Sequence, residues 1–152
     1  METIKKIIET FGEIDALWDS KVIRVNYDPL RWLLIQAEEG SPNGLAAISV
    51  SQQCRDNGTS RTEIQIMFEL CDLGWFPYYY KNVFDVFEGV VYKRDSEGRI
   101  LAVRHSMRRK LIEIAKDWDA LLEGLDYTTL SGIQDVATFF PAPFFLSGGP
   151  VQ

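Results

Sequence analysis

The stretch Leu45–Leu70, "LAAISVSQQCRDNGTSRTEIQIMFEL", decides the fold. At its centre, Asn57 and Gly58 stand between two runs of extended type. A two-residue type I′ turn needs a positive φ at both central positions, which Asn-Gly adopts at little cost. From Ile64 onward, apolar residues alternate with Glu, Gln and Met. The stretch therefore predicts a β-hairpin of an antiparallel sheet, with one packed face and one face largely in water.

Further strands are expected on both sides of this hairpin. Upstream, "KVIRVNY" (21–27) and "RWLLIQA" (31–37) are two short β-type runs around a turn that contains Asp28-Pro29. Downstream, "VFEGVVYKRDSEGRILAV" (86–103) indicates another hairpin, with "DSEG" as its turn.

Two amphipathic helices frame these strands. Residues 3–17 place apolar side chains at steps of three and four, and a second such pattern begins near Val103 and stops near Gly124. Because both helices and the sheet have one apolar face, we expect an α+β fold. It is a two-layer sandwich in which an antiparallel β-meander of about four to six strands packs on the N-terminal helix and the long C-terminal helix.

We expect a single α+β domain over residues 1–125, followed by a Phe/Pro-rich tail over residues 126–152. A short helical turn and then extended chain are predicted for this tail. Its four phenylalanines need cover, either from the domain or from a partner such as a second copy of the chain, which would form a homodimer. They are Phe139, Phe140, Phe144 and Phe145.

The composition is that of an ordinary globular domain. Of the 152 residues, 46% are hydrophobic and 25% are charged, which argues against disorder. No apolar run approaches the roughly 20 residues that cross a bilayer, and the N-terminus lacks the apolar centre of a signal peptide, so we expect a cytoplasmic protein. The two cysteines, Cys54 and Cys71, have no metal-ligand spacing, and we expect them to be reduced.

Catalytic motifs are missing from the sequence. There is one histidine, His105, and no phosphate-loop, zincin or nucleophile-elbow motif occurs. We therefore expect no enzyme, no catalytic residues, no cofactor and no metal site. An enzyme with an unrecognised site around His105 and nearby carboxylates is the remaining alternative.

The segment "LGWFPYYYKNVF" (73–84) is dense in aromatic residues. Pro77 indicates a loop or an edge rather than a central strand, and at least one of three consecutive tyrosines should be exposed. The rings either anchor the segment in the core or form a contact surface for a partner. The candidate partner-binding residues are Trp75, Tyr78, Tyr79, Tyr80 and Lys81.

Basic residues gather at the start of the C-terminal helix, although the chain has a net charge of −6. Cations in the first half and acids in the second half oppose the helix dipole. These cations either meet an anion such as a phosphate backbone or pair with the chain's own acids. The candidates for anion or nucleic-acid binding are Arg104, His105, Arg108, Arg109 and Lys110.

Five stretches in this order resemble a small family of domains of unknown function from phage, plasmid and conjugative-element proteins of bacteria. They are "TIKKIIETFG", "ISVSQQCRDNG", "EIQIMFEL", "GWFPYYYKNVF" and "RRKLIEIAKDWDALLEGL". The resemblance covers roughly Thr3 to Leu125, and it implies a helix, β-meander, helix domain without catalytic residues that could be carried over. The Phe-rich tail lies outside it.

The resemblance implies a small accessory protein of a mobile genetic element. Such proteins commonly act by binding, including as antagonists of host defence nucleases of the anti-CRISPR or anti-restriction type, and an acidic surface can imitate DNA toward a basic groove. We therefore expect a non-catalytic module that binds a protein, with a nucleic-acid-handling enzyme as one candidate partner. The alternative is a nucleic-acid-binding accessory protein that uses the Arg104–Lys110 cluster for phosphate.

Overall fold

The computed structural model describes residues 1–11, 14–19, 21–124 and 131–135. Three helices and nine strands occur within these residues. The helices are α1 (Glu2–Phe11), α2 (Asp15–Trp18) and α3 (His105–Glu123). The strands are β1 (Lys21–Asp28), β2 (Arg31–Glu38), β3 (Ala46–Asp56), β4 (Thr59–Cys71), β5 (Gly74–Asn82), β6 (Phe87–Val90), β7 (Tyr92–Arg94), β8 (Ile100–Val103) and β9 (Ser131–Asp135).

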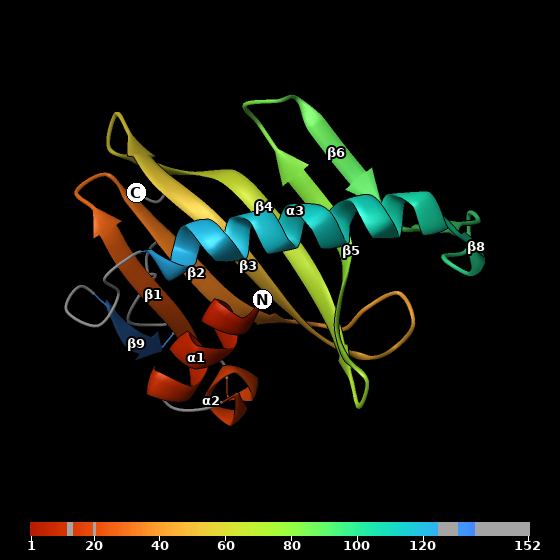
Figure 1. Cartoon of the computed structure of the whole chain (residues 1–152), viewed down its shortest axis with the longest axis horizontal. Coiled ribbons are helices and arrows are strands. Elements are labelled where there is room, and N and C mark those ends of the chain that lie inside the picture. Colours follow the sequence, from red (N-terminus) through yellow and green to blue (C-terminus); the bar gives the residue numbers. More distant parts are fainter. Residues whose placement is uncertain (12–13, 20, 125–130, 136–152) are drawn as a thin grey trace.

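The strands form one large antiparallel sheet and one small one. The seven-stranded sheet has the order β6-β5-β4-β3-β2-β1-β9, so β1 to β6 are an uninterrupted meander, and β7 pairs with β8 alone. Helices α1, α2 and α3 lie on one face of the large sheet, with α3 running across it (Figure 1). The predicted α+β fold, in which an antiparallel meander packs on an N-terminal and a C-terminal helix, is confirmed.

The central hairpin forms as its sequence predicts. Asn57 has a φ of 51° and Gly58 a φ of 78°, and Asp56 pairs with Thr59 on either side of them. Along the arms, Ile48 faces Phe68 across the two strands. A β-bulge between Gln52 and Gln53 shifts the register that the turn begins by one residue, and the shifted register brings the apolar side chains of β3 and β4 to the same face.

The core lies between the helices and one face of the sheet. Its buried members come from α1, α3 and the helix-facing positions of the strands, and they pack as one cluster. They include Ile4, Ile7, Leu33, Ile35, Val50, Ile66, Leu111 and Trp118. The two long helices are also joined by a polar contact, because the backbone N–H of Thr3 donates to Asp119 Oδ1 at 2.9 Å. An acid of α3 thus satisfies one of the free N–H groups at the start of α1.

The aromatic segment is a strand, so of the two expectations for Pro77 the loop was wrong and the edge position is confirmed. Strand β5 pairs with β4 along its whole length, while β6 pairs only with Tyr79 to Asn82. Pro77 lies in the half that has a single neighbouring strand, and the register shifts beside it, between Met67 and Phe68. A proline is tolerated here because a half-edge position and a β-bulge both remove the need for its missing N–H.

The downstream hairpin is smaller than predicted. Only β7 and β8 form it, around the turn in which the Asp95 carboxylate accepts hydrogen bonds from the N–H groups of Glu97 and Arg99. The first residues of the predicted arm, Phe87 to Val90, are β6 and extend the large sheet instead. The chain therefore leaves the large sheet between β6 and β7.

The second face of the sheet is less wet than the alternation on β4 predicts. Glu63 and Glu69 are 2% and 4% exposed. Both are satisfied, because Arg31 Nε donates to Glu63 at 3.0 Å and Asn43 and Tyr92 donate to Glu69. Burial of these carboxylates is tolerable since each has hydrogen-bond donors around it.

The C-terminal segment 126–152 is described only in part. Ser131–Asp135 is strand β9, which pairs with β1. The short helical turn expected in this segment was given no position, and most of the segment lies outside the described residues. The four phenylalanines of the predicted tail lie outside the described residues. Within the described ranges, no helix is long and apolar enough to cross a membrane.

Candidate functional site

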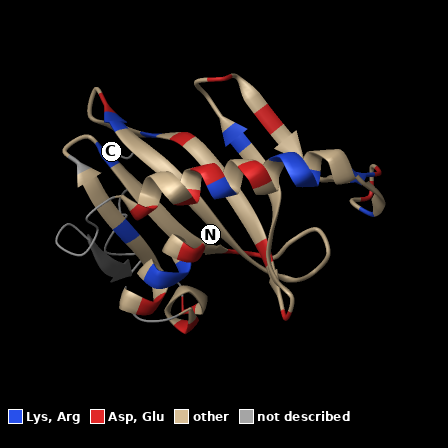
Figure 2. Cartoon of the chain, in the orientation of Figure 1, with Lys and Arg blue, Asp and Glu red and all other residues tan. Residues whose placement is uncertain are grey.

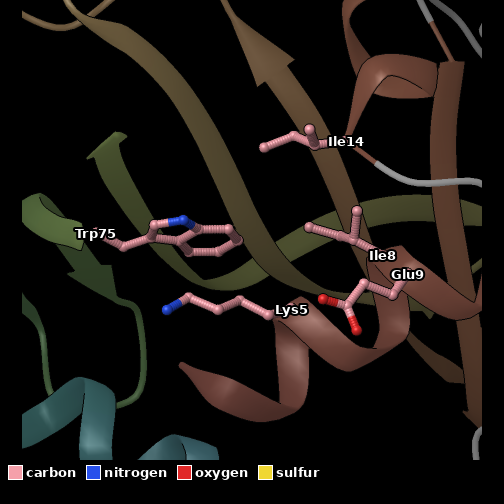
Figure 3. Close-up of a pocket in the computed structure, with 5 residues that line it drawn as sticks. All are labelled: Lys5, Ile8, Glu9, Ile14 and Trp75. Atoms are coloured by element: carbon pink, nitrogen blue, oxygen red, sulfur yellow. The ribbon is translucent and has the colours of Figure 1, made fainter. Parts of the chain in front are cut away.

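An open, mainly apolar groove lies between α1 and the start of β5. Its volume is about 590 Å³. The lining residues are Lys5, Ile8, Glu9, Ile14 and Trp75 (Figure 3). Ile8 and Ile14 face the indole of Trp75 across the recess, while Lys5 and Glu9 stand at its mouth (Figure 3).

Helical spacing brings three of the lining residues together. Lys5, Ile8 and Glu9 are three and four positions apart on α1, so they share one side of that helix. Ile14 follows directly, at the start of α2. One short segment of about ten residues thus supplies one whole wall of the groove.

Trp75 forms the opposite wall because of its place on β5. It is paired with Leu70 of β4, so it points to the helix face of the sheet. Its ring lies at 5.9 Å from the ring of Phe68, in a tilted arrangement that favours aromatic packing. Gly74, with a φ of 133°, opens the strand just before it. The indole is therefore held on one side by the core and open to the groove on the other.

Charges of both signs rim the groove. Lys5 Nζ lies 5.4 Å from the centre of the Trp75 ring and 3.0 Å from Glu2 Oε1. The hydrogen bond from Lys5 lowers the pKa of Glu2. Glu9 is exposed. The groove thus combines an apolar floor with a rim that carries both charges.

Only one of the five aromatic-segment candidates lines this groove. Trp75 does so, whereas Tyr78 and Tyr80 are 7% and 6% exposed and belong to the core cluster. Tyr79 is half-buried and Lys81 is exposed. The expectation that one of the three tyrosines would be exposed was wrong, because the register shift of β5 places Tyr78 and Tyr79 against neighbouring side chains.

The basic candidates divide into two groups. Arg104, His105, Arg109 and Lys110 are exposed around the start of α3, and Figure 2 shows a blue band of basic residues next to the tan end turn of that helix. Lys110 Nζ lies 4.2 Å from the ring of Phe87. No described residue forms an ion pair with Arg104 or Arg109. The interpretation in which these two arginines pair with the chain's own acids is therefore not realised among the described residues.

Arg108 points inward instead. Its Nη2 donates to the hydroxyl of Tyr92 at 2.8 Å, and that hydroxyl donates to the carboxylate of Glu69. Burial raises the pKa of Tyr92 to about 12, and the hydrogen bond to Glu69 adds to the shift. Arg108 thus belongs through its Nη2 to a structural network that links α3, β7 and β4, while its buried Nε has no hydrogen-bond partner among the described residues.

Groups for metal or acid-base chemistry are scattered in the described ranges. Among those residues, no three His, Cys, Asp or Glu side chains are arranged to hold a metal ion. Cys54 is buried and Cys71 is exposed, and both are free. His105 has no hydrogen bond to a carboxylate within the described part of the chain. The groove itself offers one lysine and one glutamate at its rim, which suits recognition better than bond-breaking.

With this geometry in place, one family can be assigned. Its sequence profile matches residues 2–124, which run from α1 to the end of α3. The chain belongs to the family described as Domain of unknown function (DUF6908). No curated protein sequence matches the chain, and no solved structure matches it. The resemblance to a family of domains of unknown function is thus confirmed over the helix, meander, helix unit.

Sequence reasoning missed the α1 wall of the groove in this DUF6908 domain. Lys5, Ile8 and Glu9 were visible only as part of an amphipathic helix. Nothing in a single sequence says that this helix faces Trp75, which lies more than 60 residues away. The one usable signal was Trp75 itself, an aromatic residue at the start of a strand with a glycine before it.

Proposed function

We propose that this DUF6908 domain is a non-catalytic protein-binding module whose groove takes an apolar side chain of a partner protein. The observation that carries the proposal is the recess between Ile8, Ile14 and Trp75, with Lys5 and Glu9 at its mouth. Tryptophan is among the residues that contribute most to protein interfaces. Here its ring is already fixed against Phe68, so little conformational freedom is lost on binding.

The finer part of the proposal concerns biological context. We propose an accessory role in a mobile genetic element, including antagonism of a host defence nuclease of the anti-CRISPR or anti-restriction type. The net charge of −6 supports this role, because nucleases that handle DNA present basic surfaces. Opposite net charges speed the encounter of two proteins and make it sensitive to salt.

Site-specific photo-crosslinking tests the groove. A benzophenone amino acid replaces Glu9 at the rim, and a control replaces Glu113, an exposed glutamate of α3. In lysate of the cells that encode the protein, we expect the Glu9 probe to capture one partner that the Glu113 probe does not capture. Capture of the same proteins by both probes, or of none by the Glu9 probe, would contradict the proposal.

A groove variant completes the test. Ile14→Asn places an amide in the apolar floor, and we expect it to weaken binding of the captured partner by at least tenfold, since buried amides without partners are costly. Thermal unfolding of the same variant shows whether the fold is kept. A folded Ile14→Asn protein that binds the partner unchanged would exclude this groove as the contact.

Nucleic-acid binding is the second candidate function. Arg104 and Arg109 are exposed and form no ion pair with described residues, at the helix end where their charge is least favourable for stability. Fluorescence anisotropy with labelled DNA and RNA at two salt concentrations tests this function. Binding that weakens with salt and with Arg104→Glu/Arg109→Glu supports it. Absence of binding at low salt, or binding that ignores both changes, removes it.

A further inference from the structure

Three buried apolar side chains of the large sheet lie outside the core cluster. Val22, Trp32 and Leu34 are 1%, 2% and 5% exposed, yet they do not belong to the cluster that packs under the helices. Leu34 stands between Leu33 and Ile35, which do belong to it. Because successive side chains of a strand point to opposite faces, the three residues lie on the second face of the sheet, away from the helices (Figure 1).

The described elements do not account for the burial of this patch. Helices α1, α2 and α3 cover the first face of the sheet (Figure 1). On the second face, Asn43 and Tyr92 contact Glu69 of β4, which is two strands away from β2. The guanidinium of Arg24 lies 4.2 Å from the centre of the Trp32 ring and covers one side of it. The patch therefore requires a further covering segment.

The buried indole of Trp32 also lacks a hydrogen-bond partner. Its Nε1–H is enclosed, and it meets no acceptor among the described residues. Buried donors in folded proteins are nearly always paired. We therefore expect the segment that covers Trp32 to bring an acceptor, such as a backbone carbonyl.

The longest part of the chain outside the described ranges, residues 136–152, starts beside this patch. Strand β9 ends at Asp135, which pairs with Lys21 at the start of β1. Trp32 pairs with Asn26, further along β1, so strand geometry puts it roughly 20 Å from Asp135. An extended chain spans about 3.3 Å per residue, so it covers that distance within about six residues.

The composition of this segment fits the patch. Residues 136–152 carry no charged side chain, and four phenylalanines flank Pro141 and Pro143. Proline has a carbonyl but no N–H, so a segment that contains it brings acceptors and few donors that need partners. Extended Pro-containing segments dock on aromatic side chains for this reason.

We propose that the segment Phe139–Phe145 packs on Trp32 and Leu34, across the second face of the sheet of its own chain. The phenylalanine rings cover the patch, and the Trp32 Nε1–H donates to a backbone carbonyl of the segment. The short connection from β9 favours the chain's own segment over that of a second copy, because tethering raises its effective concentration. This face is opposite the groove at Trp75, so the inference does not depend on the proposed function.

Photo-crosslinking in the full chain tests the placement. Benzoylphenylalanine replaces Phe140, and mass spectrometry maps the crosslinked peptides in an equal mixture of isotope-labelled and unlabelled protein. We expect crosslinks to β1 and β2, each within a chain of one isotope. Three results would overturn the proposal: crosslinks to the Trp75 groove, crosslinks between the two isotopes, which would indicate a second copy, or no crosslinks to β1 and β2.

Hydrogen exchange of the Trp32 indole tests the hydrogen bond. In NMR spectra of the full chain, Trp32→Phe assigns this N–H signal among those of the four tryptophans. We expect Phe140→Ser/Phe144→Ser to speed its exchange at least tenfold and to leave the signal of Trp118, in the core under α3, unchanged. Phe84→Ser, at an exposed phenylalanine of the β5–β6 turn, is the matched control and changes neither signal. Equal exchange of the Trp32 indole in the double variant and the wild type would reject the contact.

Discussion

Gly89 of β6 lies directly under Met107 of α3. A Cβ atom on Gly89 would come within 2.8 Å of the Met107 Sδ and within 3.3 Å of Leu111 Cδ2. A larger residue at position 89 would therefore force the Met107 side chain to shift, whereas no unusual backbone angle of Gly89 calls for glycine.

Gly89→Ala is expected to lower the free energy of unfolding by about 1–3 kcal/mol, as overpacking of a core does. Urea unfolding measures the change. Gly124→Ala is the matched control, because a Cβ there meets only ordinary contacts, and we expect a change below about 0.5 kcal/mol. Added to Met107→Ala, the Gly89→Ala change should cost less than it does in the wild type. Simple additivity of the two changes would show that Met107 is not the obstacle.

The β5–β6 turn contains backbone strain. Val86 has a φ of 49° and is 91% exposed, so its β-branched side chain gains little from burial. We expect Val86→Asn to raise the free energy of unfolding by roughly 0.5–1 kcal/mol, since asparagine tolerates this region better. Val83→Asn, in the same turn with no positive φ, is the comparison. Unchanged stability of Val86→Asn in thermal melts would contradict the assigned strain.

Acid should weaken the contact between Glu63 and Arg31. Burial raises the pKa of Glu63, but hydrogen bonds from Arg31, Gln52 and Cys54 outweigh burial and lower that pKa below its usual value of 4.5. A lowered pKa gives stability that is present above about pH 4.5 and is lost as the pH falls through the folded value.

Glu63→Gln should therefore be less stable than the wild type at pH 7, by about 1–3 kcal/mol, and the gap should narrow below pH 4. Urea unfolding at pH 7, 5 and 3.5 measures this difference in the free energy of unfolding. Asp56→Asn, which breaks the exposed pair with Arg61 at 3.7 Å, should change stability by less than about 1 kcal/mol at every pH. If the difference in stability between Glu63→Gln and the wild type stayed constant across this pH range, the lowered pKa of Glu63 would not contribute to stability.

Alkaline pH should lower the stability of the fold through the ionisation of three tyrosine side chains. Burial, as the largest cause, raises the pKa of Tyr78, Tyr79 and Tyr92 to about 12. The neutral phenols give stability that is complete below pH 10 and is lost as the pH rises toward 12. Absorbance at 295 nm should show at least three tyrosines still protonated at pH 11 in the folded protein, and these should become ionised when denaturant is added. Tyr92→Phe should reduce the late-titrating group by one, and a titration near pH 10 for all six tyrosines would reject the assigned burial.

The fold could be predicted from the sequence where local residue preferences agree with the tertiary packing. Asn57-Gly58 and the alternation after it predict the central hairpin, and the helical periods predict α3 and one helix over residues 3–17. The structure has two helices, α1 and α2, in place of that single N-terminal helix. Strand β5 was not readable, because Pro77 normally argues against a sheet interior. Its tolerance depends on a register shift and on the shortness of β6, which are tertiary properties.

Only one residue of the candidate site could be predicted from the sequence. Trp75 could be singled out from its aromatic surroundings, whereas its partners Ile8 and Ile14 needed the packing of α1 beside β5. Arg108 shows the opposite case. Its sequence neighbours predict an exposed cation, yet the position of Tyr92 on β7 draws it inward.

Tyr78 is the one residue of β5 that has no partner on β4, so a deletion of one codon could remove it. Pro77 pairs with Phe68 and Tyr79 with Met67, so deletion of Tyr78 would leave every other pairing in its present register. Such a deletion would keep the alternation of the meander, but it would remove the Tyr78 ring and the carbonyl that accepts a hydrogen bond from the Val91 N–H. The added residue therefore serves to tie the exit of the chain from β6 to the middle of β5.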